Sequence, residues 1–200
     1  MQPSTRLARL GVRTVLQLGD PRLREVAAPV AADQLGQAET QGLIDDLVET
    51  MRAAHGAGLA ATQIGVALRI CVIEVDHNPR YPYKPPIPLT VLVNPEVAPL
   101  SDERFENNEG CLSVPGLRGN VARFTEVAVR AWDRDGQPLA FEVRGLSAGT
   151  YQHECDHLDG RLFVDKLTDP ASLATWDNYE RHQKADYLTR VHALIERYGA

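Results

Sequence analysis

Two stretches of the chain carry apolar residues at the spacing of an α-helix. In residues 37–55 they recur every three or four positions, at Leu43, Ile44, Leu47, Val48 and Met51. This spacing predicts an amphipathic helix that ends at the glycines of "HGAGLAATQIG". A second stripe predicts a helix in the C-terminal segment, residues 169–200, and is formed by Leu188, Val191, Leu194 and Ile195.

Shorter apolar runs that are rich in β-branched residues predict strands. Residues 69–75, "RICVIEV", indicate a buried strand, and residues 90–97, "TVLVNPEV", indicate another. Between residues 127 and 143, apolar and polar residues alternate on both sides of the turn signal Asp135-Gly136, which predicts a β-hairpin. Antiparallel pairing of this kind, with few helices, favours an α+β fold over a doubly wound parallel sheet.

Length limits the organisation of the chain. Its 200 residues suffice for one core, so we expect a single domain over residues 1–200. We expect residues 1–14 to form an N-terminal extension, and residues 76–89, with five prolines, to form a surface insert. The first nineteen residues hold three arginines and no acid, a composition that organelle-targeting peptides share. Two interpretations of this segment therefore remain: a targeting peptide, or a short irregular extension before the fold.

Charge and hydropathy argue against two classes of partner. Lys and Arg number 21 against 27 for Asp and Glu, and the net charge of -6 would repel a phosphate backbone. We therefore expect no nucleic-acid substrate. The apolar runs are too short for a transmembrane segment. Three widely spaced cysteines, Cys71, Cys111 and Cys155, suit a reducing compartment better than a disulfide framework, and one of them could be a metal thiolate.

The candidate chemistry begins with "YQHECDHLDG", residues 151–160. In a helix, His153 and His157 lie on one face, so both imidazoles can reach one tetrahedral metal while Glu154 points to the side. The alternative is a surface helix with two solvated histidines, against which the apolar neighbours Leu158 and Leu162 count. Asp156 either orients a metal ligand or faces solvent. Cys155 should face away from the metal and contribute to packing.

A catalytic site of this kind needs a third protein ligand from another segment. A metzincin would place a histidine where the chain has Phe163, and the acids available to a thermolysin-like site, Glu180 and Glu196, have no recognisable context. Cys111 in "NNEGCLSVPG", residues 107–116, could present a thiolate, or could be a buried small hydrophobe. The small residues of "GAGLAATQIG", residues 56–65, allow close approach to a ligand or simply connect a helix to a strand.

Together, "GAGLAATQ", "EGCLS" and "QHECDH" in this order resemble the three signature motifs of peptide deformylases. The resemblance covers roughly residues 15–167. The family usually has proline at Thr62 and a bulkier aliphatic residue at Ala57, and neither position supplies a ligand. With the antiparallel pattern, the resemblance implies an α+β fold in which antiparallel sheets pack around a central metal-binding helix, with a helix at the C-terminus.

The resemblance also implies roles for single residues. It implies that the metal ligands are Cys111, His153 and His157. It implies that Glu154 is the catalytic acid and base, and that the Gln63 side chain and the Leu112 backbone N–H bind the developing oxyanion. Residues implied to bind the peptide backbone or the methionine side chain are Ala57, Gly58, Gly110, Leu146 and Thr150.

The expected enzyme is therefore a metal-dependent hydrolase that removes the N-formyl group from the formylmethionine of nascent polypeptides and releases formate. The resemblance implies iron(II), with zinc, nickel or cobalt as substitutes, and a thiolate ligand suits iron(II) or zinc. We expect nascent formyl-Met peptides as partners, a transient contact with the ribosome, and the bacterial cytoplasm. Two alternatives remain: a zincin-type endopeptidase, and a non-catalytic metal-binding module that would leave Glu154 without a purpose.

Overall fold

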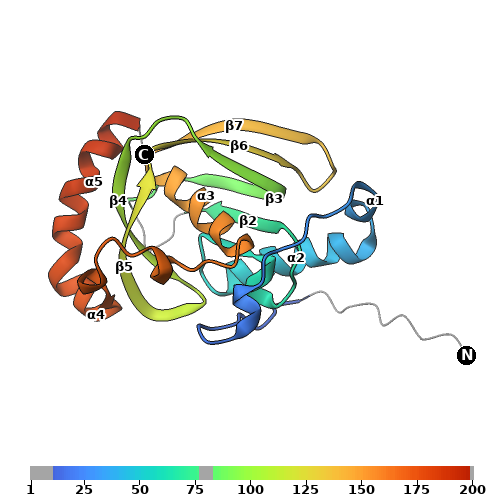
Figure 1. The fold of residues 1–200 in the computed structure, drawn as a ribbon, viewed down its shortest axis with the longest axis horizontal. Helices are drawn as coiled ribbons and strands as arrows, with labels where there is room; N and C mark the ends of the chain where they lie inside the picture. Colours follow the sequence, from blue (N-terminus) through green and yellow to red (C-terminus); the bar gives the residue numbers. More distant parts are fainter. Residues whose placement is uncertain (1–10, 77–82, 199–200) are drawn as a thin grey trace, which may run out of the picture.

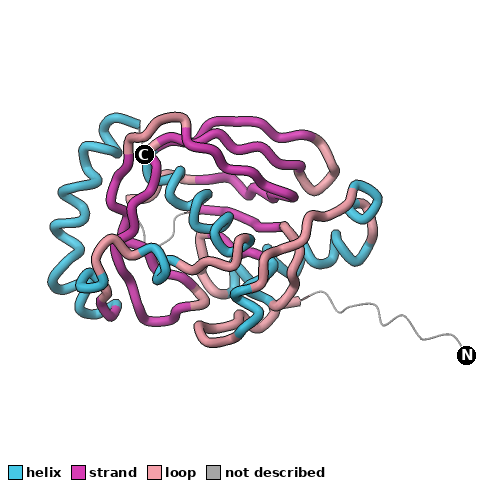
Figure 2. Tube along the Cα trace, in the orientation of Figure 1, coloured by secondary structure: helices cyan, strands magenta, loops and turns pink. Residues whose placement is uncertain are grey.

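The fold is described from a computed structural model that covers residues 11–76 and 83–198 (Figure 1). Most of the predicted extension, residues 1–14, and residues 77–82 of the proline-rich insert lie outside the described residues. Within the part that is described, antiparallel strands form two sheets and a helix lies between them (Figure 2). The expected α+β class is confirmed.

The larger sheet has five strands in the order β1-β2-β3-β6-β7. They are β1 (Gly58–Ala60), β2 (Ile70–Val75), β3 (Ile87–Pro99), β6 (Glu126–Trp132) and β7 (Pro138–Arg144). Each neighbouring pair is antiparallel, and the predicted hairpin is β6–β7, in which Val129 pairs with Phe141. Among the described residues, β1 is an edge strand of this sheet, with β2 as its strand partner.

The smaller sheet has three strands in the order β4-β5-β8. They are β4 (Arg104–Cys111), β5 (Val114–Phe124) and β8 (Ala174–Thr175). β4 and β5 pair antiparallel, and the register shifts between Gly110 and Cys111, so that Cys111 pairs with Val114 across a tight turn. The shift places Cys111 at the end of an edge strand.

Five α-helices and several short turns complete the described part. The α-helices are α1 (Ala32–Leu35), α2 (Ala38–Ala53), α3 (Gly145–Leu158), α4 (Trp176–Asn178) and α5 (Lys184–Tyr198). Short 3₁₀ helices span Pro21–Arg24, Ala61–Ile64, Phe163–Lys166 and Pro170–Ser172, and a π-helical turn spans Tyr179–Gln183. Both helices predicted from apolar stripes are present, as α2 and α5. In this part of the chain, no helix combines the length and apolarity needed to cross a bilayer.

Both faces of the larger sheet are covered by helices, as the nearly continuous apolar run of β2 requires. Cys71 and Ile73 face α3, where they pack with Ala148, Tyr151 and Leu158. Ile70 and Val72 point the other way and pack with Ile44, Leu47 and Met51 of α2. The helix α3 therefore lies in the interior, between the larger sheet and β5 (Figure 1).

The packing of α2 on the sheet gives a stability prediction. Leu47 is fully buried, so Leu47→Ala should leave a cavity and lower the free energy of unfolding by about 2–5 kcal/mol. Leu100→Ala, at a side chain that is 45% exposed, is the matched control and should cost less than about 1 kcal/mol. Urea unfolding of both variants measures the difference, and a loss below 1 kcal/mol for Leu47→Ala would contradict the packing.

Candidate metal centre

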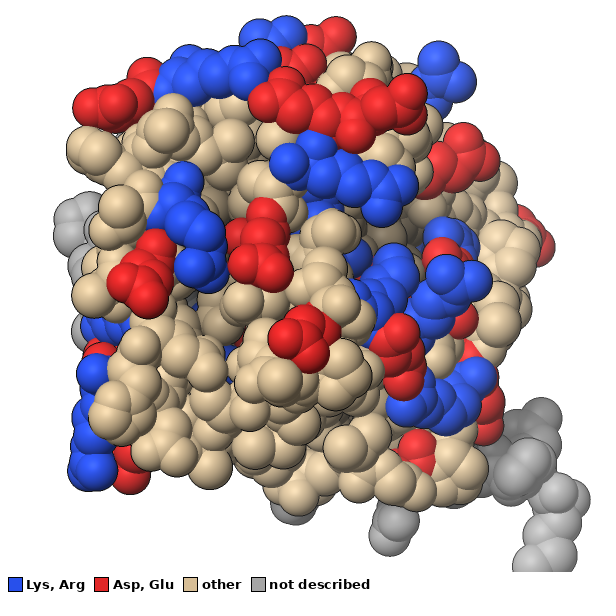
Figure 3. All heavy atoms as spheres, turned by 60° about the vertical axis from the view of Figure 1, so that its left-hand side comes forward, with Lys and Arg blue, Asp and Glu red and all other residues tan. Residues whose placement is uncertain are grey.

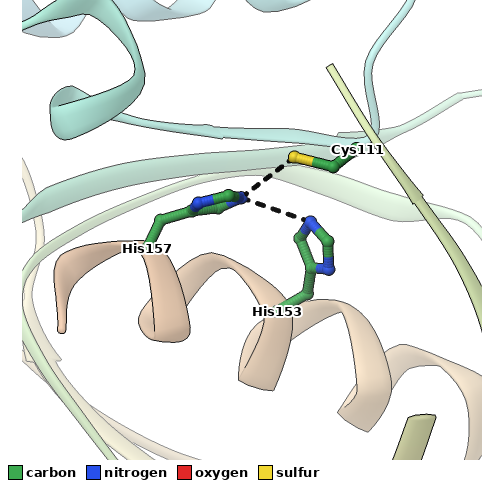
Figure 4. A group of neighbouring side chains, drawn as sticks. All are labelled: Cys111, His153 and His157. Carbon is green, nitrogen blue, oxygen red and sulfur yellow. Dashed lines mark hydrogen bonds between the residues drawn. The ribbon is translucent and has the colours of Figure 1, made fainter. Parts of the chain in front are cut away.

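Three side chains from two separate segments converge at the middle of the fold (Figure 4). His153 and His157 project from the same face of α3, and their Nε2 atoms lie 3.3 Å apart. Cys111 reaches them from the end of β4, with its Sγ 3.3 Å from His157 Nε2. All three ligand atoms lie within 4.8 Å of one another, which is the spacing that one metal ion requires.

The donor set fits a single divalent transition metal. One thiolate and two imidazoles are ligands that zinc and iron(II) accept, and three protein ligands leave a coordination position for water or substrate. Burial, together with the charge of His153, lowers the pKa of His157 well below its usual value, which keeps this imidazole neutral, as a metal ligand must be. Helix α3 therefore bears a Cys/His/His metal site.

Two hydrogen-bond donors, one from the turn between β4 and β5 and one from the 3₁₀ helix Ala61–Ile64, lie near the sulfur of Cys111. The backbone N–H of Ser113 points at Sγ from 3.4 Å, and Gln63 Nε2 lies 3.5 Å from it. Gln63 Nε2 also donates to Ser113 Oγ at 3.1 Å. These contacts hold the sulfur of Cys111 in place beside the two histidines.

A buried ion-pair network fixes the ring of His153. His153 Nδ1 and Glu109 Oε2 are 2.8 Å apart, so the ring donates to the carboxylate and its Nε2 faces the other ligands. Arg123 donates to both oxygens of Glu109, at 2.7 and 2.9 Å, and to Asp156 Oδ2 at 2.6 Å. Lys166 donates to the second oxygen of Asp156. Asp156 is therefore a member of this network and does not face solvent.

The network also sets the charges beside the metal ligands. Burial alone would raise the pKa of Glu109, but the charge and hydrogen bonds of Arg123 and His153 outweigh it and hold that pKa well below its usual range. Burial lowers the pKa of His153, but Cys111 and Glu109 outweigh burial and raise it. Negative groups that favour a proton on His153 also favour a metal cation at the ligand atoms.

Glu154 lies beside the ligands, and one of its oxygens has no partner. Its side chain is buried, and Oε2 makes no hydrogen bond. Burial raises the pKa of Glu154 to about 7, although the charges of His153 and Lys84 act in the opposite direction. A Cβ at Gly58 would collide with the Glu154 carboxylate, so only glycine leaves room for it. The arrangement gives a carboxyl group that can accept and return a proton near neutral pH.

A cavity of about 420 Å³ opens in front of these residues. Its lining includes nine of the residues that the sequence predicted for the site, namely Ala57, Gly58, Gln63, Gly110, Cys111, Leu112, Thr150, His153 and Glu154. β1 and β4, which carry Gly58 and Gly110, are both edge strands of their sheets. An edge strand of each sheet therefore contributes residues to the cavity.

One predicted pocket residue lies elsewhere. Leu146 is buried with Tyr179, Tyr187 and Val191 and is not among the residues that line the cavity, so its assignment to the methionine pocket stays a prediction. The C-terminal segment covers the first turn of α3, which the sequence pattern did not reveal. Cys155, by contrast, lies in the core on the side away from the metal ligands, and its thiol, together with burial, raises the pKa of Cys71.

Sequence reasoning missed residues that lie around the site rather than in its motifs. Glu109 and Arg123 were not singled out, although Glu109 precedes the Gly110-Cys111 pair directly. The general tendency of metal-bound histidines to donate to a carboxylate could have pointed to Glu109. Arg118 and Lys84, which also line the cavity, carried no such signal.

The chain is similar to peptide deformylases in sequence and in structure. A family model described as polypeptide deformylase matches residues 12–172. Peptide deformylase 1 of Bordetella pertussis is 48% identical over 158 residues, covering 79% of this chain and 89% of the relative. Peptide deformylase 2 of Pseudomonas syringae pv. tomato is 44% identical over 166 residues, covering 83% and 93%.

A solved structure shares the fold. The class I type b peptide deformylase of Acinetobacter baumannii, bound to Met-Ala-Ser, superposes with a TM-score of 0.76 at 37% identity and covers 79% of this chain and 99% of that one. The family-model match, residues 12–172, includes the segments that carry the three metal ligands. By family model, sequence identity and fold, the chain belongs to the polypeptide deformylase family, and it is a metal-binding hydrolase that removes the N-formyl group from nascent peptides.

Proposed function

We propose that Glu154 transfers the proton during removal of the formyl group. The observation that carries this proposal is the buried Oε2 of Glu154, which has no hydrogen-bond partner beside the three ligand atoms. A divalent ion held by Cys111, His153 and His157 supplies Lewis acidity that makes water a stronger nucleophile. Glu154 accepts a proton from the attacking water and then returns it to the departing amine, which leaves formate and a free N-terminus.

Two donors stabilise the oxygen of the formyl group as it becomes negative. We assign them to the Nε2 group of Gln63 and the backbone N–H of Leu112, and both residues line the cavity. Gln63 is held in place because its Oε1 accepts from the Ala60 N–H at 2.9 Å while its Nε2 donates to Ser113. A single donor of this type contributes about 3–4 kcal/mol to transition-state stabilisation in other enzymes.

The peptide substrate binds as an added strand between the two sheets. β1 and β4 are edge strands of their sheets in the described part of the chain, and both line the cavity, which supports pairing of the peptide backbone near Ala57, Gly58 and Gly110. Backbone pairing recognises many sequences, which suits an enzyme that acts on nascent formyl-Met peptides. The Acinetobacter baumannii peptide deformylase was solved with Met-Ala-Ser bound, which supports a short peptide as the ligand of this site.

Iron(II) is the proposed physiological ion, with zinc, nickel or cobalt as substitutes. One thiolate and two imidazoles suit these ions and disfavour magnesium and calcium, which prefer oxygen ligands. A reducing compartment would keep both the ion and the thiolate of Cys111 intact, and the three cysteines are free thiols. The bacterial cytoplasm fits this requirement.

A transient contact with the ribosome follows from action on nascent chains. Figure 3 shows acidic and basic side chains interspersed on the face that comes forward from the α4 and α5 side of the molecule. Several basic groups of α5 are paired, for example Arg197 with Glu103 at 2.7 Å and Arg190 with Glu106 at 3.4 Å. Mixed charge on this face favours a brief encounter with the ribosome over a stable complex.

The role of Glu154 predicts a separation of metal binding from turnover. Glu154→Ala should keep the metal and lower the rate of formate release from formyl-Met-Ala-Ser by at least about 10²-fold, because the proton acceptor is lost. Glu49→Gln, at an exposed position of α2, is the matched control and should keep full activity. Metal analysis and a formate assay on the same preparations test this prediction. Unchanged turnover of Glu154→Ala would contradict the role of Glu154 in proton transfer.

The thiolate ligand predicts a different result for two cysteines. Cys111→Ala removes one of three ligands and should abolish stable metal binding, whereas Cys155→Ala should keep the metal because that thiol lies in the core. Both proteins are purified without oxygen, and their metal content per chain is measured. Full metal occupancy of Cys111→Ala would show that the third ligand is another residue.

The hydrogen bond to His153 predicts a change in metal affinity. Glu109→Gln keeps the shape of the side chain but removes the charge that orients the ring, so the affinity for zinc should fall by roughly 10–100-fold. Glu106→Gln, on the same strand at a more exposed position, should bind zinc like the unaltered chain. Competition with a chelator measures both affinities, and equal values for the two variants would refute the orienting role.

A further inference from the structure

A tyrosine of the C-terminal segment contacts the strand that carries metal-site residues. Tyr187 lies on α5, outside residues 12–172 that the family model matches. Its side chain is buried and packs in a cluster with Leu146 of α3. Its hydroxyl donates to Asn107 Oδ1, on β4, at 2.9 Å. A residue beyond the family match is therefore hydrogen-bonded to the strand that ends at Cys111.

Asn107 passes this contact on to a residue that holds a metal ligand. Asn107 Nδ2 donates to Glu109 Oε1 at 3.1 Å, and Glu109 Oε2 lies 2.8 Å from His153 Nδ1. A Cβ at Gly149 would lie 2.8 Å from Asn107 Nδ2, so glycine at this position allows the amide to pack directly on α3. A continuous series of three hydrogen bonds, which we name the tyrosine relay, thus joins Tyr187 to His153.

The groups on either side of the amide determine how it is turned. Both oxygens of Glu109 accept from Arg123, at 2.7 and 2.9 Å, so the carboxylate presents only acceptors to Asn107. An amide turned by 180° would place its oxygen against this carboxylate. Burial raises the pKa of Tyr187, so the phenol keeps the proton that it donates to the amide oxygen. A donor on one side and an acceptor on the other therefore select one orientation of Asn107.

Loss of the tyrosine hydroxyl would leave the amide oxygen of Asn107 without its donor. Asn107 is 3% exposed, and a buried acceptor without a partner is costly. Asn107 also lines the cavity, so the amide would lower this cost by turning toward it. That movement would weaken the hydrogen bond to Glu109, which orients the ring of His153.

We infer that Tyr187 is a positioning residue of the metal centre, which acts through Asn107 and Glu109 to orient His153. The C-terminal segment thereby contributes to metal affinity, although Tyr187 is not itself a ligand. This inference rests on the proposed function, in which Glu109 orients His153 for the ion, and it extends that role to a helix beyond the family match.

The test compares two tyrosines on the full-length chain. Tyr187→Phe keeps the ring and removes the hydroxyl, so the affinity for zinc should fall by about fivefold, the effect of one ordinary hydrogen bond. Tyr179→Phe, in the same buried cluster, removes a hydroxyl outside the tyrosine relay and should bind zinc like the unaltered chain. Competition with a chelator measures both affinities. The visible absorption bands of the cobalt-loaded chain report the ligand geometry, and they should shift in Tyr187→Phe alone.

A second variant guards against a folding defect at Tyr187 and tests whether the effect passes through the amide. Asn107→Ala breaks the tyrosine relay at its centre, so it should lower the zinc affinity at least as much as Tyr187→Phe does. Because the two residues are in contact, adding Tyr187→Phe to Asn107→Ala should lower the affinity further by less than about twofold.

The outcomes separate this inference from the proposed function. Zinc affinity and cobalt bands that stay unchanged in Tyr187→Phe, an equal loss in Tyr179→Phe, or a full further loss in the double variant would overturn the inference alone. If Glu109→Gln bound zinc like the unaltered chain, the orienting role in the proposed function would fail, and the inference with it.

Discussion

Arg123 is buried between two carboxylates, and its contacts connect the three segments that make the site. It binds Glu109 of β4 and Asp156 of α3, and Glu109 in turn holds His153. A buried charge is tolerated only when its partners satisfy it, and Arg123 and Glu109 are 2% and 4% exposed at their side chains. Removal of either partner would leave an unpaired charge inside the fold. The network therefore fixes the position of α3 relative to the smaller sheet, and with it the distance between the two histidines and Cys111.

Two glycines, Gly58 and Gly149, leave room for polar side chains around the site. Gly58 lies against the Glu154 carboxylate, and Gly149 lies against the amide of Asn107, so in both places backbone and polar groups approach more closely than a Cβ would allow. The first contact keeps Glu154 buried, and burial raises its pKa to about 7. The second contact lets the amide of Asn107 pack directly on the backbone of α3. Glycine at these two positions thus permits contacts between α3 and its neighbours that a Cβ would prevent.

The metal site depends on the packing of α3 as well as on its ligands. Apolar residues on one side of α3 pack on the larger sheet, while His153 and His157 face Cys111 at the end of β4. Cys155, next to Glu154 in sequence, lies on the packed side beside β2. Because neighbouring residues of a helix point in different directions, one short segment supplies both the core contacts and the chemistry. A helix so placed can hold its ligands rigidly, as catalytic geometry requires.

The sequence by itself determined the α+β class, the two longer helices with apolar stripes, the hairpin, and the three metal-ligand positions. These features have local signals: regular spacing of apolar residues, an Asp-Gly turn, and motifs in which ligands and their neighbours stand close in the chain. Only the tertiary structure decided the rest. The contact between Arg123 and Glu109, the burial of Leu146 under the C-terminal segment, and the meeting of Lys84 with Thr150 join residues that are distant in sequence. No local pattern encodes such pairs, because the packing of sheets and helices sets which distant side chains meet.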